Sequence, residues 1–339
     1  MYRRLAVSKK RGFESAEKRH TRDVDLIADD DLKDAGESVV ISAFYKFVPM
    51  PDVAEFRDRV LDVCDRAGMF GSILIAPEGI NGTVAGSNAA TDELFDWLRS
   101  DPRFTDLQVK RSFDSEVPFR RMKVRLKREI VTFGHSVDPT VRVGTYVDPG
   151  DWNDVISDPD VLVIDTRNAE EVSIGTFENA VDPDTESFGE FADFVATLDP
   201  TRHSKVAMFC TGGIRCEKAS SYMLGQGFGE VLHLKGGILQ YLEDVDPAES
   251  LWRGECFVFD ERVTVDHELQ AGDYTLCRGC RRALAEEDRA EASYEEGVCC
   301  ASCVDSLTDE RADRLRERHR QMHLAHERGV PHLASKPPQ

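Results

Sequence analysis

Apolar and polar residues follow one spacing in the first part of the chain and another in the middle part. Up to about residue 135, alternating runs such as "SVVISAFYKFV" predict strands, and apolar residues at helical spacing, such as Phe56 and Val60, predict helices between them. The predicted order βαββαβ is that of a split-βαβ, ferredoxin-like fold. The dipeptide Asn81-Gly82 favours a tight hairpin between the second and third strands. We therefore expect an α+β domain over residues 38–135.

From about residue 140 the apolar runs become continuous. "VLVIDTR", "VAMFCTGG" and "VLHLKGG" each end in polar residues or glycine, which is typical of central strands in a parallel sheet covered on both faces. Helical patterns lie between these runs, so we expect an α/β domain over residues 140–247. Ligands of such domains bind at the carboxyl ends of the strands. Asp165, Arg167 and Cys210 should therefore meet at one edge of the sheet.

The two ends of the chain show neither pattern. Residues 1–22 hold eight Lys and Arg, and the next fifteen residues hold seven acids against Lys33. Opposite charge blocks with few apolar residues predict a disordered, charged extension over residues 1–37. Residues 248–339 form a small cysteine-rich region that ends in a polar, basic helix, "RADRLRERHRQMHLAHER". A solvent-exposed helix and a tRNA-contacting arm both fit this last pattern.

Composition limits the location and the partners. No stretch approaches the roughly eighteen apolar residues of a membrane helix, and no N-terminal apolar segment marks secretion, so we expect a cytoplasmic protein without a membrane partner. The nine cysteines then indicate metal binding or chemistry rather than disulfides. A net charge of −20 argues on average against a nucleic-acid partner.

One segment contradicts that average. The basic segment, residues 110–128, carries eight cations against Asp114 and Glu116, which gives +6 in nineteen residues. In "RMKVRLKR" the cations alternate with apolar residues, as on a strand with one basic face. A solvated strand face is one explanation for such a run. Uncompensated cations repel one another unless an anion binds between them, so the charge excess favours phosphate binding. The predicted tRNA-binding residues are Lys110, Arg111, Arg120, Arg121, Lys123, Arg125, Lys127 and Arg128.

The string "MFCTGGIRCEKAS" supplies the candidate chemistry. A buried strand over residues 206–209 and a helix over residues 217–224 enclose a short glycine-containing loop that begins at Cys210. Backbone N–H groups and the positive end of the helix dipole then point at the thiol, which favours a reactive thiolate. The alternative is a small core residue at a strand end. The predicted site is Cys210 with Thr211, Gly212, Gly213, Ile214 and Arg215, with Asp165 and Arg167 nearby and Cys216 as a candidate resolving thiol.

A second cysteine pattern lies near the C-terminus. Cys277-x2-Cys280 and Cys300-x2-Cys303 are separated by nineteen residues, a spacing that suits tetrahedral zinc. The alternative is four reduced thiols in a small, loop-rich region. Cys299 adjoins the second pair and leaves the choice of ligands open. We expect a structural zinc ion held by Cys277, Cys280, Cys300 and Cys303.

Several strings together carry a family resemblance. "DTRNAEE", the cysteine loop and "GFGEVLHLKGGI" resemble a rhodanese domain, and "APEGINGTVAG", "PFRRMKVRLKREIVTFG" and "LWRGECFVFDERVTVDH" resemble the rhodanese-containing tRNA uridine(34) hydroxylases (TrhO). The likeness runs from about residue 38 into the C-terminal region. It implies oxygen-dependent conversion of the wobble uridine to 5-hydroxyuridine, with the anticodon loop of tRNA as partner, no DNA, and molecular oxygen as co-substrate. The family's persulfide-forming cysteine corresponds to Cys210.

The residues themselves leave other functions open. The sequence has no dinucleotide-binding glycine fingerprint and no two-histidine, one-carboxylate pattern, so the electron donor is not predicted. A sulfurtransferase would use the same cysteine persulfide. A rhodanese-related phosphatase would have five residues between cysteine and arginine, whereas this loop has four. A pure tRNA-binding module would be expected to have lost Cys210.

Overall fold

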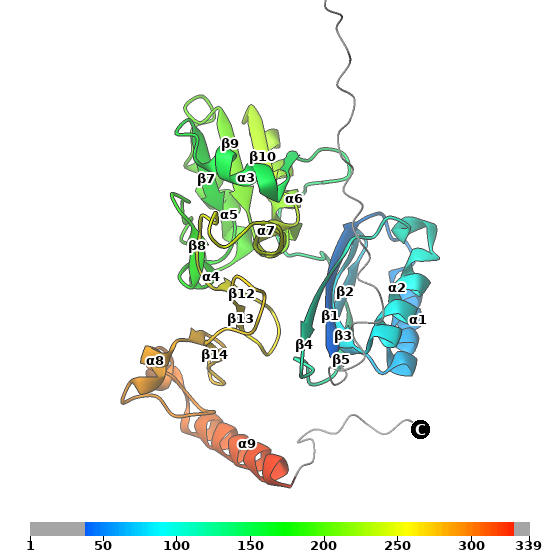
Figure 1. Cartoon of the computed structure of the whole chain (residues 1–339), viewed down its shortest axis with the longest axis vertical. Helices are drawn as coiled ribbons and strands as arrows, with labels where there is room; N and C mark the ends of the chain where they lie inside the picture. Colours follow the sequence, from blue (N-terminus) through cyan, green and yellow to red (C-terminus); the bar gives the residue numbers. More distant parts are fainter. Residues whose placement is uncertain (1–37, 329–339) are drawn as a thin grey trace, which may run out of the picture. The chain divides into compact units, whose positions relative to one another are not determined.

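The computed structural model describes residues 38–328 (Figure 1), and the predicted extension over residues 1–37 lies outside this range. The first domain is a five-stranded sheet in the order β4-β1-β3-β2-β5. Its first four strands have the ferredoxin-like order, and β5 adds a strand parallel to β2. The elements are β1 Val39–Phe47, α1 Val53–Ala67, β2 Phe70–Ala76, β3 Gly79–Gly86, α2 Asn88–Arg99, β4 Val109–Asp114 and β5 Met122–Leu126.

Both helices of this domain lie side by side against one face of the sheet (Figure 1). Their apolar residues explain the arrangement, because Phe56 and Val60 of α1 and Leu94 of α2 are fully buried in the core that they form with the sheet. Gly68 ends α1 in the left-handed conformation with φ 69°, and the Ser87 side chain accepts a hydrogen bond from the Ala90 N–H at the start of α2. The predicted ferredoxin-like fold is confirmed.

The hairpin predicted at Asn81-Gly82 is wrong. The turn between β2 and β3 is Pro77-Glu78, and Asn81-Gly82 lies inside β3, where Asn81 pairs with Leu74. Gly82 is needed for packing instead, because a Cβ there would lie 3.0 Å from the side chains of Phe44 and Ile73.

The central domain contains a parallel sheet in the order β6-β10-β9-β7. Side chains of β9 alternate between two cores, because Phe209 packs with Trp152 on one face while Met208 packs with Phe191 on the other. The predicted α/β class is confirmed. The elements are β6 Thr145–Val147, α3 Pro149–Ile156, β7 Val161–Asp165, α4 Ala169–Val172, β8 Gly175–Phe177, α5 Phe191–Ala196, β9 Lys205–Phe209, α6 Ile214–Gly225, β10 Glu230–Leu234 and α7 Gly237–Asp244.

In the described part of the C-terminal region, residues 248–328, the strands form only short two-stranded sheets, and there are two α-helices. The elements are β11 Trp252–Gly254, β12 Cys256–Phe257, β13 Thr264–Val265, β14 Thr275–Leu276, β15 Ala283–Leu284, α8 Glu286–Ala290 and α9 Asp309–Glu327. Cysteines rather than large apolar residues fill its small core, together with Leu284, Val298 and Ala312. Within residues 38–328, no helix combines the length and apolar character needed to cross a membrane.

Candidate active site and cysteine cluster

Cys210 follows the last residue of β9, and the turn after it leads directly into α6. We call residues 210–213 the Cys210 loop. This loop is shorter than expected, because α6 begins at Ile214 rather than at Glu217. Gly213 has φ 99°, a left-handed conformation that glycine adopts without strain, and its N–H donates a hydrogen bond of 3.1 Å to the Cys210 Sγ. The loop therefore presents a backbone donor to the sulfur.

The first turn of α7 supports the loop from a second side. The N–H of Ile238 donates to the carbonyl of Cys210 at 2.9 Å, and the N–H of Leu239 donates to that of Thr211 at 3.1 Å. Gly237 permits this approach, because a Cβ there would lie 2.4 Å from the Cys210 carbonyl oxygen. These contacts hold the backbone of Cys210 and Thr211 against the first turn of α7.

The surroundings of Cys210 favour its anion. Burial alone raises the pKa of the thiol, but a hydrogen bond from Cys216, the charge of Arg215 and two backbone N–H groups outweigh burial and lower the pKa to about 6. Burial and the neighbouring Cys210 sulfur raise the pKa of Cys216. Cys64 and Cys256 are equally buried but lack such donors, and burial raises the pKa of each to about 12.

Arg215, one of the predicted site residues, directs its guanidinium group to Glu171. Two hydrogen bonds of 2.8 and 2.6 Å join the side chains, and both are almost fully buried. Burial alone would raise the pKa of Glu171, but the charge and hydrogen bonds of Arg215 lower it overall. Arg215 thus acts on Cys210 through its charge while Glu171 holds it in place. Glu171 was not among the predicted site residues, and its local signal is its place at the third position of α4, where it accepts a hydrogen bond of 3.1 Å from the Asn168 N–H.

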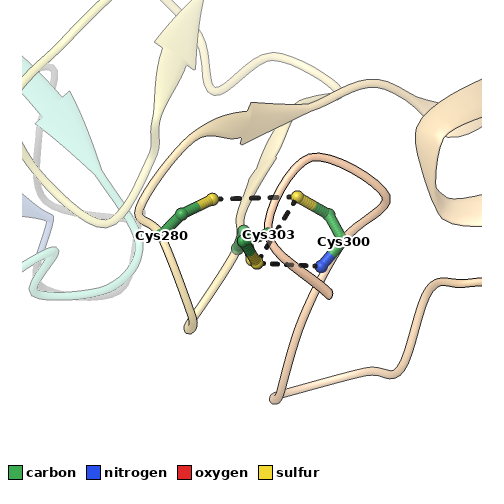
Figure 2. A group of neighbouring side chains, drawn as sticks. Cys280, Cys300 and Cys303 are labelled. Carbon is green, nitrogen blue, oxygen red and sulfur yellow. Dashed lines mark hydrogen bonds between the residues drawn. The ribbon is translucent and has the colours of Figure 1, made fainter. Parts of the chain in front are cut away.

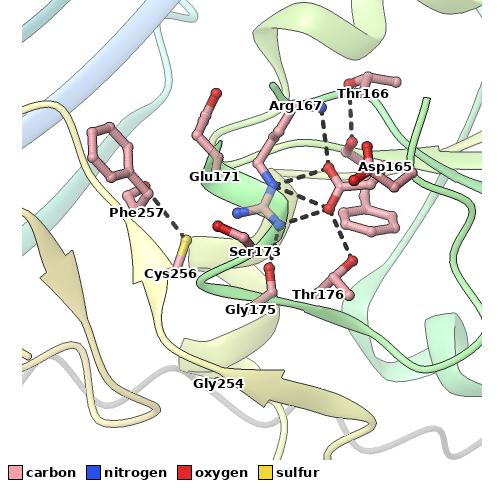
Figure 3. A network of polar contacts seen from close by, with 12 residues as sticks. Asp165, Thr166, Arg167, Glu171, Ser173, Gly175, Thr176, Gly254, Cys256 and Phe257 are labelled. Carbon is pink, nitrogen blue, oxygen red and sulfur yellow. Dashed lines mark hydrogen bonds and ion pairs between the residues drawn. The ribbon is translucent and has the colours of Figure 1, made fainter. Parts of the chain in front are cut away.

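Asp165 and Arg167 form a buried pair that supports the site. Arg167 donates to the Asp165 carboxylate at 2.9 Å from Nε and 2.6 Å from Nη2, and both side chains are fully buried. Figure 3 shows Thr176 donating to the same carboxylate, at 2.9 Å. Between them in sequence, Thr166 donates from its backbone N–H to the Phe209 carbonyl at 3.0 Å. The structure therefore places this pair in the scaffold that anchors the end of β9.

A carboxyl group shared by two tyrosines lies on the first turns of α6. Glu217 accepts a hydrogen bond of 2.9 Å from the Tyr45 hydroxyl and bonds of 2.9 and 2.8 Å from the Tyr146 hydroxyl. Burial raises the pKa of Glu217, although the hydrogen bonds from the two tyrosines oppose the rise. Tyr45 comes from the first domain, 172 positions away in sequence. No sequence pattern pointed to this group.

The basic segment does not form one continuous strand. Its first part is β4 and its last part is β5, which lie at opposite edges of the five-stranded sheet. Arg111 pairs with Asp92 at 2.6 Å, and Arg120 pairs with Glu261 at 3.2 Å. Lys110 points to the Cys210 loop, where its Nζ donates to the Gly212 carbonyl at 3.4 Å. Among residues 38–328 no ion pair is formed by the remaining cations, Arg121, Lys123, Arg125, Lys127 and Arg128.

Lys123 and Arg125 lie on the face of β5 that the helices leave uncovered. Their strand partners in β2 are Ser72 and Leu74, whereas Val124 is buried in the core on the other face. The predicted alternation of basic and apolar positions is therefore present. A cation of the C-terminal region lies close to the basic segment. Arg278 donates to the Glu261 carboxylate at 2.9 Å, and the same carboxylate binds Arg120 at 3.2 Å.

The four predicted zinc ligands lie together. Their sulfur atoms all lie within 4.8 Å of one another, and three of the separations are 3.7 Å (Cys277 to Cys303), 3.7 Å (Cys280 to Cys300) and 3.9 Å (Cys300 to Cys303). Figure 2 shows the sulfurs of Cys280, Cys300 and Cys303 facing one another. Four sulfurs at about 2.3 Å from one Zn²⁺ in a tetrahedron lie about 3.8 Å apart. The residues therefore fit a zinc ion.

Cys299 lies outside this group. Its sulfur faces the Ser293 carbonyl at 3.7 Å. Of these two neighbouring cysteines, Cys300 and not Cys299 therefore lies with the other predicted ligands. We call Cys277, Cys280, Cys300 and Cys303 the four-cysteine cluster.

Comparison with known proteins identifies both main domains. Residues 39–130 match the UPF0176 acylphosphatase-like domain, and residues 148–244 match the rhodanese-like domain. A rhodanese-related protein from Thermoplasma volcanium is 21% identical over 30% of this chain and 95% of its own, with a TM-score of 0.26. A rhodanese-like domain from Anabaena is 18% identical over 33% of this chain and 80% of its own, with a TM-score of 0.27. The dark-state structure of BlrB, a BLUF protein, is 20% identical over 28% of this chain and 76% of its own, with a TM-score of 0.25.

Proposed function

The chain has the UPF0176 (TrhO) family architecture, an acylphosphatase-like domain followed by a rhodanese-like domain, and from this premise we propose that it hydroxylates the wobble uridine of tRNA. The proposed product is 5-hydroxyuridine. One atom of molecular oxygen would be added to C5 of the uracil ring, and the other would be released as water. This reaction consumes two electrons and two protons. We propose a thiol reductant as the electron source.

The observation that carries the proposal is the activated sulfur of Cys210. Its pKa is lowered to about 6 by its neighbours, so the anion predominates at neutral pH. A sulfur anion can add to C6 of uracil, which moves electron density to C5, the carbon that reacts with oxygen. Release of the sulfur from C6 with loss of the C5 proton then restores the ring. Cys210 is proposed to play this nucleophilic part, as thiolate or as persulfide.

The charges outside the loop support RNA as the proposed substrate class. Lys123 and Arg125 lie on the open face of the sheet, and Arg121, Lys127 and Arg128 flank them. Phosphate groups of an RNA backbone would neutralise such cations and release counterions. A wobble uridine lies in a single-stranded loop, so its base can be splayed into a protein site without opening a duplex.

Purified full-length protein tests the proposal directly. We would incubate it with tRNA, dithiothreitol and isotopically heavy dioxygen, and then analyse the digested nucleosides by mass spectrometry. We expect 5-hydroxyuridine that carries the heavy oxygen. Cys210→Ser should give none, while Cys64→Ser, which changes an equally buried thiol in α1, should keep the activity. Unlabelled uridine together with sulfur transfer to a thiol acceptor would support a sulfurtransferase instead.

A further inference from the structure

Lys110 belongs by sequence to the basic segment, but its side chain lies at the Cys210 loop. Lys110 in β4 pairs with Ala43 in β1, so Lys110 and Tyr45 lie on the same face of the sheet, because side chains alternate along a strand. Phe44, between Ala43 and Tyr45, points to the other face and packs on Phe95 of α2. The face that carries Lys110 and Tyr45 is therefore the one without helices.

Both side chains reach the backbone around Cys210. Lys110 Nζ donates to the Gly212 carbonyl at 3.4 Å, and it lies 3.0 Å from the position that a Cβ at Gly236 would take. The Tyr45 hydroxyl lies 2.9 Å from the position that a Cβ at Gly213 would take. Larger residues at these glycines would displace the two side chains. The loop and the first domain are thus fitted to each other.

A buried ion pair next to the loop holds this arrangement. Lys218 of α6 is 1% exposed and binds Glu129 at 2.6 Å and Glu78 at 2.9 Å, both of which lie before the central domain. It also donates to the Val131 carbonyl at 3.0 Å. Removing one partner of such a buried group is costly. The contact between the first domain and the start of α6 is therefore specified by charge and not by packing alone.

We propose that the reactive site is built from both domains, with Lys110 as a positioning residue whose ammonium group stabilises the sulfur anion on Cys210. The rhodanese-like domain alone would then hold an incomplete site. The Thr211 hydroxyl is buried without a hydrogen-bond partner among the described residues, and a Cβ on Gly212 would meet no atom within 4 Å. The loop therefore keeps a free donor and open space for a substrate beside the lysine.

Other charges near Lys110 set the pH range of this effect. Burial lowers the pKa of Lys110 to about 8, while the sulfurs of Cys210 and Cys256 and the carboxylates of Glu243 and Asp244 oppose the decrease. Lys110 is therefore charged at neutral pH and loses its charge above about pH 8.

Groups on other elements also act on the sulfur. Arg215 and Cys216 of α6 favour the anion at Cys210, whereas the carboxyl of Glu217 disfavours it when ionised. Between about pH 6 and 8, both the Lys110 ammonium and the Cys210 anion are present. The effect of Lys110 should consequently be largest near pH 6, where the Cys210 thiol titrates.

Alkylation of Cys210 tests this proposal without tRNA. The rate of reaction with iodoacetamide would be measured from pH 5 to 9 by mass spectrometry of the Cys210 peptide in the full-length protein. In Lys110→Met the midpoint should rise by about one pH unit, which lowers the rate near pH 6 about fivefold. Lys110→Arg should restore the midpoint. Lys205→Met, which removes a cation at the opposite end of β9 from Cys210, should leave it unchanged.

The gap between wild type and Lys110→Met should close above about pH 8, where the anion forms in both proteins. An unchanged midpoint in Lys110→Met would overturn the proposal. If this variant loses its thermal transition, Lys110→Gln, which keeps a donor for Gly212 without the charge, provides the same comparison. The proposal rests on the proposed function only in taking Cys210 as the reactive thiol, so a failure here leaves the nucleoside experiment as a separate test.

Discussion

The Cys210 loop and the four-cysteine cluster use the same side chain in two opposite environments. Around Cys210, backbone N–H groups, a hydrogen bond from Cys216 and the charge of Arg215 favour a reactive anion, and we propose that Lys110, bound to the Gly212 carbonyl, adds to them. In the four-cysteine cluster the sulfurs face one another at 3.7–3.9 Å, and only a cation between them would offset their mutual repulsion as thiolates. The neighbours of a cysteine, rather than its burial, thus determine its chemistry.

The largest expected effect separates Cys210 from its neighbour Cys216. Cys210→Ser should lower 5-hydroxyuridine formation by about 1,000-fold or more, because a hydroxyl at this position does not ionise at neutral pH. Cys216→Ser should leave a substantial fraction of the activity, because Cys216 contributes only a hydrogen bond to the Cys210 sulfur. Both rates would be measured on the same tRNA preparation. Full activity in Cys210→Ser would contradict the assignment of the nucleophile.

Metal removal should affect the other cysteine region. We propose about one zinc ion per chain in the four-cysteine cluster, and chelation should unfold the C-terminal region, because Cys277, Cys300 and Cys303 belong to its small core. Cys280→Ser should abolish stoichiometric zinc in elemental analysis and lower the thermal midpoint. Cys299→Ser, at a cysteine whose sulfur lies outside the cluster, should retain zinc. A metal-free wild-type protein with an unchanged midpoint would show that the four thiols are merely reduced.

A smaller effect is expected when the planar guanidinium group of Arg215 is replaced by a side chain that keeps the positive charge. Arg215→Lys loses the two-point contact with Glu171, and we expect a cost of about 1.5–3 kcal/mol in the free energy of unfolding together with slower Cys210 alkylation. Arg253→Lys is the matched control, because its pair with Glu178 is exposed and should cost less than about 1 kcal/mol. Equal costs in denaturant titrations would mean that the buried pair adds nothing.

The smallest expected effect concerns tRNA binding and leaves both cysteine regions intact. Replacing Arg121, Lys123 and Arg125 by alanine should make the slope of log affinity against log salt shallower by about two units. Replacing Arg57, Arg59 and Arg66 of α1, on the helical face, removes the same charge and should change the slope little. Titrations at several salt concentrations give both slopes. If the two triple variants behave alike, the cations of β5 form only a solvated face.

Local patterns predicted most of the fold. Continuous apolar runs identified β7, β9 and β10, and the short run before Cys210 correctly placed this residue at the end of a central strand. Spacing alone grouped the four C-terminal cysteines, because each pair lies within one tight turn. The wrong hairpin shows the limit of such rules, since Asn81-Gly82 is a turn dipeptide that packing requirements placed within a strand.

The contacts that tune the site were not predictable because they join distant parts of the chain. Glu171 meets Arg215 across 44 positions, Lys110 meets Gly212 across 102, and Tyr45 meets Glu217 across 172. The sequence of a strand such as β1 does not show which residue on its uncovered face will contact another domain. Charge did mark Lys110, but as one member of a basic run rather than as a partner of the Cys210 loop.

The central claim is that Cys210 serves hydroxylation of the wobble uridine, and tRNA nucleosides from living cells test it most directly. Cells that lack the gene and any other source of 5-hydroxyuridine would receive the wild-type gene, the Cys210→Ser gene or no gene, and their tRNA would be digested for mass spectrometry. We predict 5-hydroxyuridine only with the wild-type gene, and unmodified wobble uridine in the other two. Equal amounts of 5-hydroxyuridine with the wild-type and Cys210→Ser genes, or none with either at normal protein levels, would contradict the claim.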